Sequence, residues 1–105
     1  MRKIDTDETL VSKLRKGDEK AFDVIYERYW ERLYSYAYRR LSPADMAYEL
    51  TQDVFVSLWV RRDQLSIQVS LSGYLFGAMR NQIFKYINRS DVRARYLEDF
   101  LRFNQ

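Results

Sequence analysis

The stretch from residue 18 to residue 41 constrains the fold most, because its apolar residues recur at intervals of three and four. Such spacing places them along one side of an α-helix rather than on one face of a strand. The residues of this stripe are Ala21, Phe22, Ile25, Tyr26, Tyr29, Leu33, Ala37 and Leu41. Other aromatic residues, Trp30, Tyr34, Tyr36 and Tyr38, fall on the remaining sides. A long helix that is aromatic nearly all round must be covered by several neighbours.

Capping residues predict where the first three helices begin. Thr6 or Asp5 can cap a helix from about Asp7 to Lys16, and Gly17 follows it where a C-terminal glycine belongs. Asp18 is a candidate N-cap for the long second helix. The third helix is predicted to start at Ser42-Pro43-Ala44-Asp45, with Ser42 as cap, Pro43 in the first turn and Asp45 completing a capping box.

The second half of the chain predicts a loop and one or two further helices. Residues 62–70 break the helical period, although the alternation of Leu65, Ile67 and Val69 permits a short strand. A fourth helix is predicted from about Leu71 to Arg89, and a separate amphipathic stretch from Val92 to Phe103. Three glycines and one proline in 105 residues leave few turns, which argues against an all-β fold. We therefore expect one all-α domain, a compact bundle of four to five helices.

The absence of two residue types excludes several kinds of chemistry. Without cysteine there is no disulfide framework or thiolate metal site, and without histidine there is no imidazole zinc site or His-dependent triad. We therefore expect no cofactor and no metal. No apolar run reaches the roughly 18 residues of a membrane span, and the N-terminus has no signal-peptide core. A cytoplasmic protein without membrane insertion is the expectation.

Charge is distributed unevenly along the chain. Residues 1–60 hold 10 basic and 11 acidic residues, whereas residues 61–105 hold 8 basic and 4 acidic ones. No acid occurs from Gln64 through Ser90. An acidic first half and a basic second half favour two different partners, although chance asymmetry in a small domain is the alternative.

The predicted third helix has two distinct sides. Its core stripe is Ala47, Leu50, Thr51, Val54 and Leu58. The other side, here called the docking face, is Glu49, Gln52, Asp53, Val56 and Val60. Two aliphatic residues among acids and an amide on an outward side suggest a surface that docks on a basic partner. The alternative is a solvated face on which scattered valines carry no function.

The predicted fourth helix divides in the same way. Its core side is Leu75, Met79, Ile83, Tyr86 and Ile87. A second line, here called the recognition stripe, is Tyr74, Ala78, Asn81, Lys85 and Asn88, flanked by Arg80 and Phe84. Lysine neutralises phosphate, asparagine hydrogen-bonds base edges, and an aromatic ring stacks on an unpaired base. These residue types on an acid-free face favour nucleic-acid binding, with a solvated polar face as the alternative.

From about Leu10 to Arg89 the chain resembles region 2 of a bacterial sigma factor of the small, extracytoplasmic-function type. The opening Leu14-(x)₂-Gly17-Asp18-(x)₂-Ala21-Phe22-(x)₂-Ile25-Tyr26-(x)₂-Tyr29 is similar to that of the family. Residues 47–59 resemble its polymerase-binding helix, and Gly73-Tyr74-Leu75-Phe76 with Arg80-Asn81 resembles its promoter-melting segment. Each motif alone is weak, but three of them occur in register.

The resemblance implies a sigma region 2-like fold, partners and site residues. The partners would be the clamp of the RNA polymerase β′ subunit, the −10 non-template strand of promoter DNA and an anti-sigma factor. The docking face would bind the clamp. The DNA-binding residues would be Arg61, Arg62, Ser70, Tyr74, Asn81, Lys85, Asn88 and Arg89.

The chain departs from the family in three ways. Tyr48 stands where the family usually has an acid, and Tyr74 stands where tryptophan is frequent. Such factors also carry a second, helix-turn-helix domain, which is not found in this sequence. We therefore expect residues 1–90 to form the region 2 domain, and residues 91–105 to lead into the linker to an absent domain. Truncation and a natural single-domain variant are both open.

Two other classes of function compete with this one. The first is a helical protein-interaction module without a nucleic-acid role. The second is an enzyme that uses carboxylates alone, such as Glu27 with Glu31. Pairing of these acids with Arg28 and Arg32 along the helix explains them more simply. We therefore expect no catalytic residues.

Overall fold

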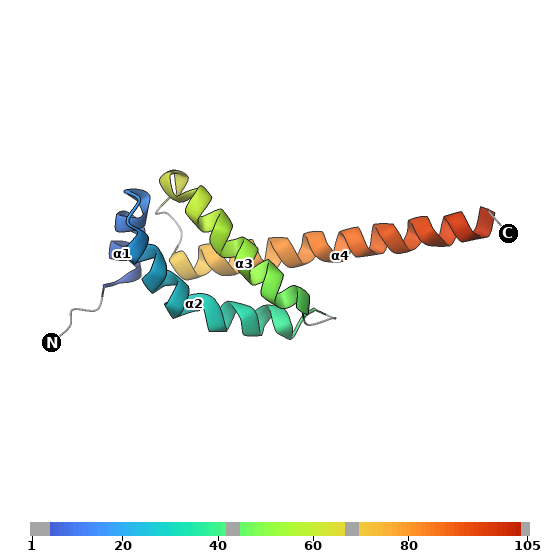
Figure 1. The fold of residues 1–105 in the computed structure, drawn as a ribbon, viewed down its shortest axis with the longest axis horizontal. Coiled ribbons are helices and arrows are strands. Elements are labelled where there is room, and N and C mark those ends of the chain that lie inside the picture. Colours follow the sequence, from blue (N-terminus) through green and yellow to red (C-terminus); the bar gives the residue numbers. More distant parts are fainter. Residues whose placement is uncertain (1–4, 42–44, 67–69, 104–105) are drawn as a thin grey trace.

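The computed structural model describes residues 5–41, 45–66 and 70–103, which form four α-helices and one short 3-10 helix (Figure 1). In chain order the elements are α1 (Asp7–Arg15), α2 (Glu19–Tyr38), α3 (Asp45–Val60), the 3-10 helix η1 (Arg62–Gln64) and α4 (Leu71–Phe103). No strand occurs among these described residues, and the prediction of an all-α fold is confirmed. The predicted cap Ser42 and first-turn Pro43, and Ile67 and Val69 of the permitted strand, lie outside them.

The predicted N-caps of the first two helices, and the glycine between these helices, are confirmed. The Thr6 hydroxyl accepts a hydrogen bond from the Thr9 amide at 3.2 Å, so Thr6 caps α1. Asp18 caps α2, since its carboxylate accepts from the amides of Lys20 and Ala21. Between the two helices Gly17 adopts a φ of 86°, a left-handed conformation that costs glycine little. α2 therefore turns back tightly against α1.

The core is built around α2, which contacts α1, α3 and α4. Five residues of its predicted stripe are fully enclosed: Ala21, Ile25, Tyr29, Leu33 and Ala37. The predicted core stripe of α3 is buried as well. The hydroxyl of buried Thr51 is hydrogen-bonded, since it donates to the Ala47 carbonyl at 2.7 Å. Phe55 lies outside both predicted stripes, yet it is 2% exposed and its ring centroid is 4.7 Å from that of Tyr26.

The aromatic residues of α2 are covered unevenly. Trp30 stacks on Tyr34 with a centroid distance of 5.0 Å and an interplanar angle of 6°. Both rings are half-buried, whereas Tyr38 at the end of α2 is exposed. The expectation that several neighbours cover this helix thus holds for Ala37, which is fully buried, but not for Tyr38, which is 53% exposed.

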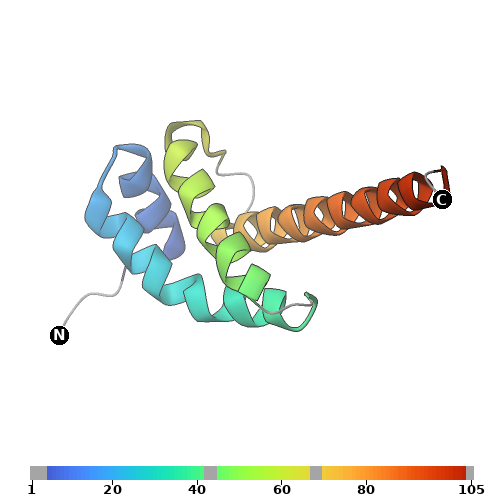
Figure 2. The same cartoon turned by 45° about the vertical axis from the view of Figure 1, so that its right-hand side comes forward.

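One prediction about the C-terminal part is corrected: α4 continues without a break from Leu71 to Phe103. Ser90 and Asp91 are common cap residues, but no glycine or proline stands near them to stop the helix. Beyond the bundle α4 projects away from the other helices (Figures 1 and 2), and the structure measures 70 × 25 × 21 Å. Ile87, predicted on the core side, is 44% exposed because α4 has left its neighbours there.

A polar network ties the start of α1 to the middle of α2. The Tyr29 hydroxyl donates to one carboxylate oxygen of Asp7, and Arg28 Nη1 contacts the other at 2.7 Å. Arg28 Nη2 also donates to the Asp5 carbonyl at 2.9 Å. Burial raises the pKa of Tyr29 above 10.0, and the hydrogen bond and negative charge of Asp7 raise it further, against smaller opposing effects of Arg32 and Arg28.

This raised pKa predicts that alkali destabilises the fold through Tyr29. The folded state holds the phenol proton more tightly than the unfolded chain does, so the contribution is complete below pH 10.0. It is lost as pH rises from there through the folded-state pKa. Urea unfolding at increasing pH should show a steeper loss of stability for the wild type than for Tyr29→Phe. Parallel losses in the two proteins would contradict this assignment.

Candidate functional site

The docking face of α3 is largely open to solvent. Glu49 and Asp53 are exposed, and Val56 and Val60 expose 59% and 66% of their surfaces. Gln52 differs, because it is half-buried and its Nε2 donates to the Tyr26 hydroxyl at 2.8 Å. Four of the five predicted residues are therefore available to a partner, while the Gln52 amide already holds α3 against α2.

A hollow of about 400 Å³ adjoins the docking face at Val56. Its walls are the rings of Phe22 and Trp59, whose centroids are 5.5 Å apart, and its rim carries Glu19 and Asp23. The periodicity of single helices did not reveal it, since its two aromatic walls come from α2 and α3. An apolar hollow with an acidic rim, next to two exposed valines, suits an apolar side chain of a basic partner.

The recognition stripe of α4 is exposed over most of its length. Asn81, Lys85 and Asn88 are exposed, as is the flanking Phe84 at 66%. Tyr74 is half-buried and packs against the core, so its ring is only partly available for stacking. The Ser70 hydroxyl accepts from the Gly73 amide at 3.0 Å and thereby caps the start of α4.

The arginines that precede α4 are not equivalent. Arg61 is exposed. The guanidinium carbon of Arg62 lies 4.1 Å from the centroid of the Trp59 ring, and its Nη1 donates to the Trp59 carbonyl at 2.8 Å. Arg62 is thus held against the end of α3, whereas the charge of Arg61 is free to face solvent.

The two predicted surfaces meet along one edge. Glu49 and Asp53 from the docking face line the same hollow as Lys85 and Arg89 from α4, and its volume is about 230 Å³. Carboxylates beside cations lower the positive potential available to a phosphate at that edge. Sequence periodicity had placed these acids and bases on separate helices and gave no indication that they are neighbours.

Comparison with known proteins decides the family. The model for Sigma-70 region 2 matches residues 25–93 of this chain. The chain belongs to the Sigma-70 region 2 family. The match begins at Ile25 within α2 and covers all of α3 and most of α4. The docking face and the recognition stripe therefore both lie inside it.

This region 2 domain is similar to one curated sigma factor and to one solved region 2 structure. It is 28% identical over 71 residues to the ECF RNA polymerase sigma factor SigW of Bacillus subtilis (strain 168), a match covering 68% of this chain and 38% of SigW. A solved NMR structure, an engineered region 2 of sigmaE in complex with GTAAAA, has a TM-score of 0.76 and 27% identity. That likeness covers 89% of this chain and 97% of the other. The expected sigma region 2-like fold is thereby confirmed.

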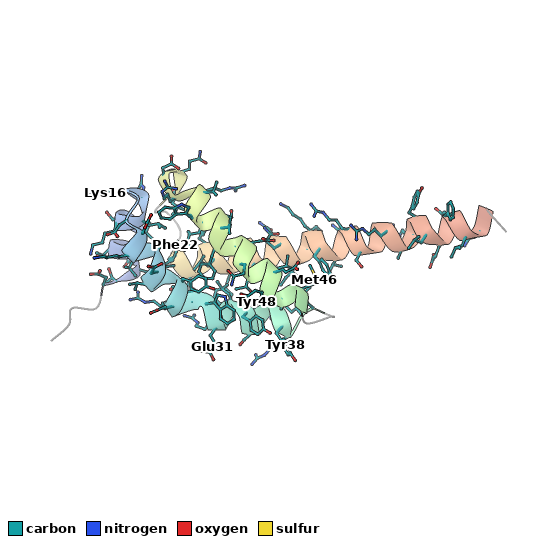
Figure 3. The ribbon with its side chains drawn as sticks, in the orientation of Figure 1. Lys16, Phe22, Glu31, Tyr38, Met46 and Tyr48 are labelled. Atoms are coloured by element: carbon teal, nitrogen blue, oxygen red, sulfur yellow. The ribbon has the colours of Figure 1, made fainter. Side chains whose placement is uncertain are left out.

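Tyr48 occupies a defined place in this region 2 domain. Its ring meets that of Trp30 edge-on, with centroids 6.0 Å apart. The Tyr48 side chain, labelled in Figure 3, remains 53% exposed. The ring that stands in place of the family's usual acid thus packs on Trp30 of α2 while half of its surface stays open to solvent.

No helix within the described residues combines the length and apolar character of a membrane-crossing segment.

Proposed function

We propose that this domain acts in transcription initiation by docking on the RNA polymerase β′ clamp and capturing unpaired bases of the promoter −10 element. The observation that carries the proposal is the exposed, acid-free recognition stripe of α4 in a chain of the Sigma-70 region 2 family. Single-strand capture needs no nucleotide hydrolysis. Binding energy gained on unpaired bases offsets the unpairing of the duplex and so stabilises the melted state.

The chemistry of α4 supports this role residue by residue. Asn81 and Asn88 offer exposed carboxamides, which donate to and accept from the edges of bases. Lys85 supplies a cation for the phosphate backbone. Exposed Phe84 adds a stacking surface that complements the half-buried Tyr74. The loop residues Arg61 and Ser70 and the helix residue Arg89 extend the proposed DNA surface to both sides.

The docking face supports the second contact. Exposed Glu49 and Asp53 suit a basic partner, and Val56 with the hollow of Phe22 and Trp59 suits its apolar side chains. A basic clamp that engages the two acids also neutralises their negative charge beside Lys85 and Arg89. We therefore expect the isolated domain to bind DNA weakly, and more tightly once docked.

Further partners are proposed for the full-length factor. The match spans about two fifths of the length of SigW. We propose that residues 1–90 form the functional region 2 unit, and that residues 91–105 lead toward a second DNA-binding domain. An anti-sigma factor that covers the docking face is the expected regulator.

Neutralising Lys85 and truncating Asn81 tests the DNA contact. Lys85→Ala is expected to weaken single-strand binding for every sequence by about fivefold at 0.1 M salt and to lower its salt slope by about 0.7. Asn81→Ala should instead relax the preference among bases at one position by roughly tenfold. Fluorescence anisotropy with a library of −10-like single strands and matching duplexes measures both, with Lys20→Ala as an exposed-lysine control. Equal binding to duplex and single strand, unaffected by either substitution, would contradict the proposal.

A further inference from the structure

A second cationic surface lies away from the recognition stripe, at the C-terminal end of α2. Arg32 of α2, and Arg39 and Arg40 directly after its last residue, line a hollow of about 370 Å³, together with the rings of Tyr36 and Phe76. This arginine hollow joins α2 to the first turns of α4, because Phe76 meets Tyr36 edge-on with centroids 5.5 Å apart. Phe76 belongs to the segment that resembles the family's promoter-melting motif, but the three arginines lie outside the family motifs quoted above and outside the proposed clamp contact.

Two of the three guanidinium groups are held in place by aromatic rings. The guanidinium carbon of Arg40 lies 3.5 Å from the centroid of Tyr36, and its Nη1 donates to the Tyr36 carbonyl at 2.9 Å. The guanidinium carbon of Arg32 lies 5.7 Å from the centroid of Phe76. Apart from the Arg40 Nη1 bond to the Tyr36 carbonyl, stacking on rings leaves the N–H groups of these arginines available to an anion, and it reduces the entropy lost when they bind one.

The charge of the hollow is not neutralised internally. Within the described residues the ion pairs are Lys13–Asp5 and Arg28–Asp7, so none of the three arginines is paired with a carboxylate. Glu31 is the acid on the wall of the hollow, against three cations. An excess of guanidinium groups beside aromatic rings is the chemistry that binds phosphate.

We infer that the arginine hollow binds backbone phosphates of a nucleic-acid strand, as a contact additional to the recognition stripe. The inference rests on the proposed function, because it extends the path of the strand captured there. Around α4 the order is Asn81, Phe84, Arg80, Phe76, in steps of about 40 to 60° at 100° per residue. Phe84 and Arg80 are both exposed, so a ring and a cation lie between the two sites.

The path around α4 needs nucleotides beyond those that lie along the recognition stripe. A helix with its side chains is about 10–12 Å across, so a strand already bound along the stripe must be extended at one end to pass to the other side of α4. Gly73 and Gly77 fall on the same side of α4 as Arg80 and Phe84, where the absence of a side chain lets a backbone approach closely. An acidic peptide would find the cations but would make no use of the exposed ring of Phe84.

Oligonucleotide length separates the two contacts. A −10-like hexamer reaches the recognition stripe alone, whereas a strand extended by about six nucleotides at its 5′ or 3′ end also reaches the hollow. Arg39→Ala/Arg40→Ala removes two phosphate contacts, each worth about 0.7 in salt slope, which predicts roughly 20-fold weaker binding at 0.1 M salt. This loss is expected for one of the extended strands, with a slope lower by about 1.4 and hexamer binding unchanged.

The control variant removes the same charge elsewhere. Lys16→Ala/Lys20→Ala alters two exposed lysines, and Lys16 and Tyr38, the residue before Arg39, lie at opposite ends of the α1–α2 pair in Figure 3. Binding of all strands by this control should stay within about twofold of the wild type. Because loss of the Arg40–Tyr36 contacts could weaken the end of α2, Arg39→Gln serves as a second variant, which removes one charge without placing an acid at the C-terminal end of α2. Arg39 is exposed, so this variant should bind the same extended strand about fivefold more weakly, with a salt slope lower by about 0.7 and an unchanged melting temperature.

Three results would overturn the inference: unchanged binding of both extended strands, an equal loss for hexamer and extended strands, or stronger competition by polyglutamate than by an unrelated single strand. Failure of the proposed function looks different. If Lys85→Ala changes nothing while the arginine variants still weaken an extended strand, the hollow binds nucleic acid and the recognition stripe does not.

Discussion

Replacing Phe55 with alanine is expected to lower the free energy of unfolding by about 3–5 kcal/mol, the usual cost of deleting a buried aromatic side chain. Phe55 exposes 2% of its surface and its ring meets Phe22 edge-on and Tyr26 at a tilt. Its removal leaves a cavity between α2 and α3. Urea unfolding followed by circular dichroism measures the change.

Phe84→Ala is the matched control for this prediction. The same side chain is deleted, but Phe84 is 66% exposed on α4, so its loss should change stability by no more than about 0.5 kcal/mol. Comparable effects of the two substitutions would show that the α2–α3 contact is not where the fold gains its stability.

Reversing the charge of Asp53 is expected to weaken binding to the β′ clamp by about tenfold or more, because a basic partner then meets a like charge. Asp53 is exposed, so the melting temperature should remain nearly unchanged. Titration of a labelled clamp fragment with the wild type and Asp53→Lys gives the two dissociation constants.

Glu27→Lys makes the same change of charge at an exposed position of α2. It should leave clamp binding within about twofold of the wild type, apart from a uniform shift with ionic strength. If Asp53→Lys binds the clamp as tightly as Glu27→Lys does, the docking face is a solvated surface.

Helix starts were predictable because the signals that define them are local. The caps Thr6 and Asp18 and the left-handed Gly17 depend on a few neighbouring residues, and all three occupy the predicted positions. The C-terminal end of α4, and the point at which α4 leaves the core, could not be predicted in this way. Whether Ile87 is buried depends on where α2 and α3 end in space, and whether the helix continues past Ser90 depends on the absence of a stop signal rather than on a positive one.

The candidate site was predictable one helix at a time. Periodicity identified which side chains share a face of α3 or α4, since a helix fixes those directions. It could not identify contacts between helices. The amide of Gln52 is engaged with Tyr26, Arg62 is packed on Trp59, and Asp53 shares a hollow with Lys85, and each arrangement depends on tertiary packing.

The central claim is that α4 reads single-stranded promoter DNA, and chemical-shift mapping of the ¹⁵N-labelled chain with −10-like hexamers tests it most directly. The account predicts saturable shifts at Asn81, Lys85 and Asn88 of α4. It predicts no shift at Lys16, which follows α1, or at Glu27 of α2. Duplexes of the same sequence should produce smaller shifts at equal concentration. Shifts confined to residues outside α4 and its preceding loop, or identical shifts with duplex and single strand, would contradict the account.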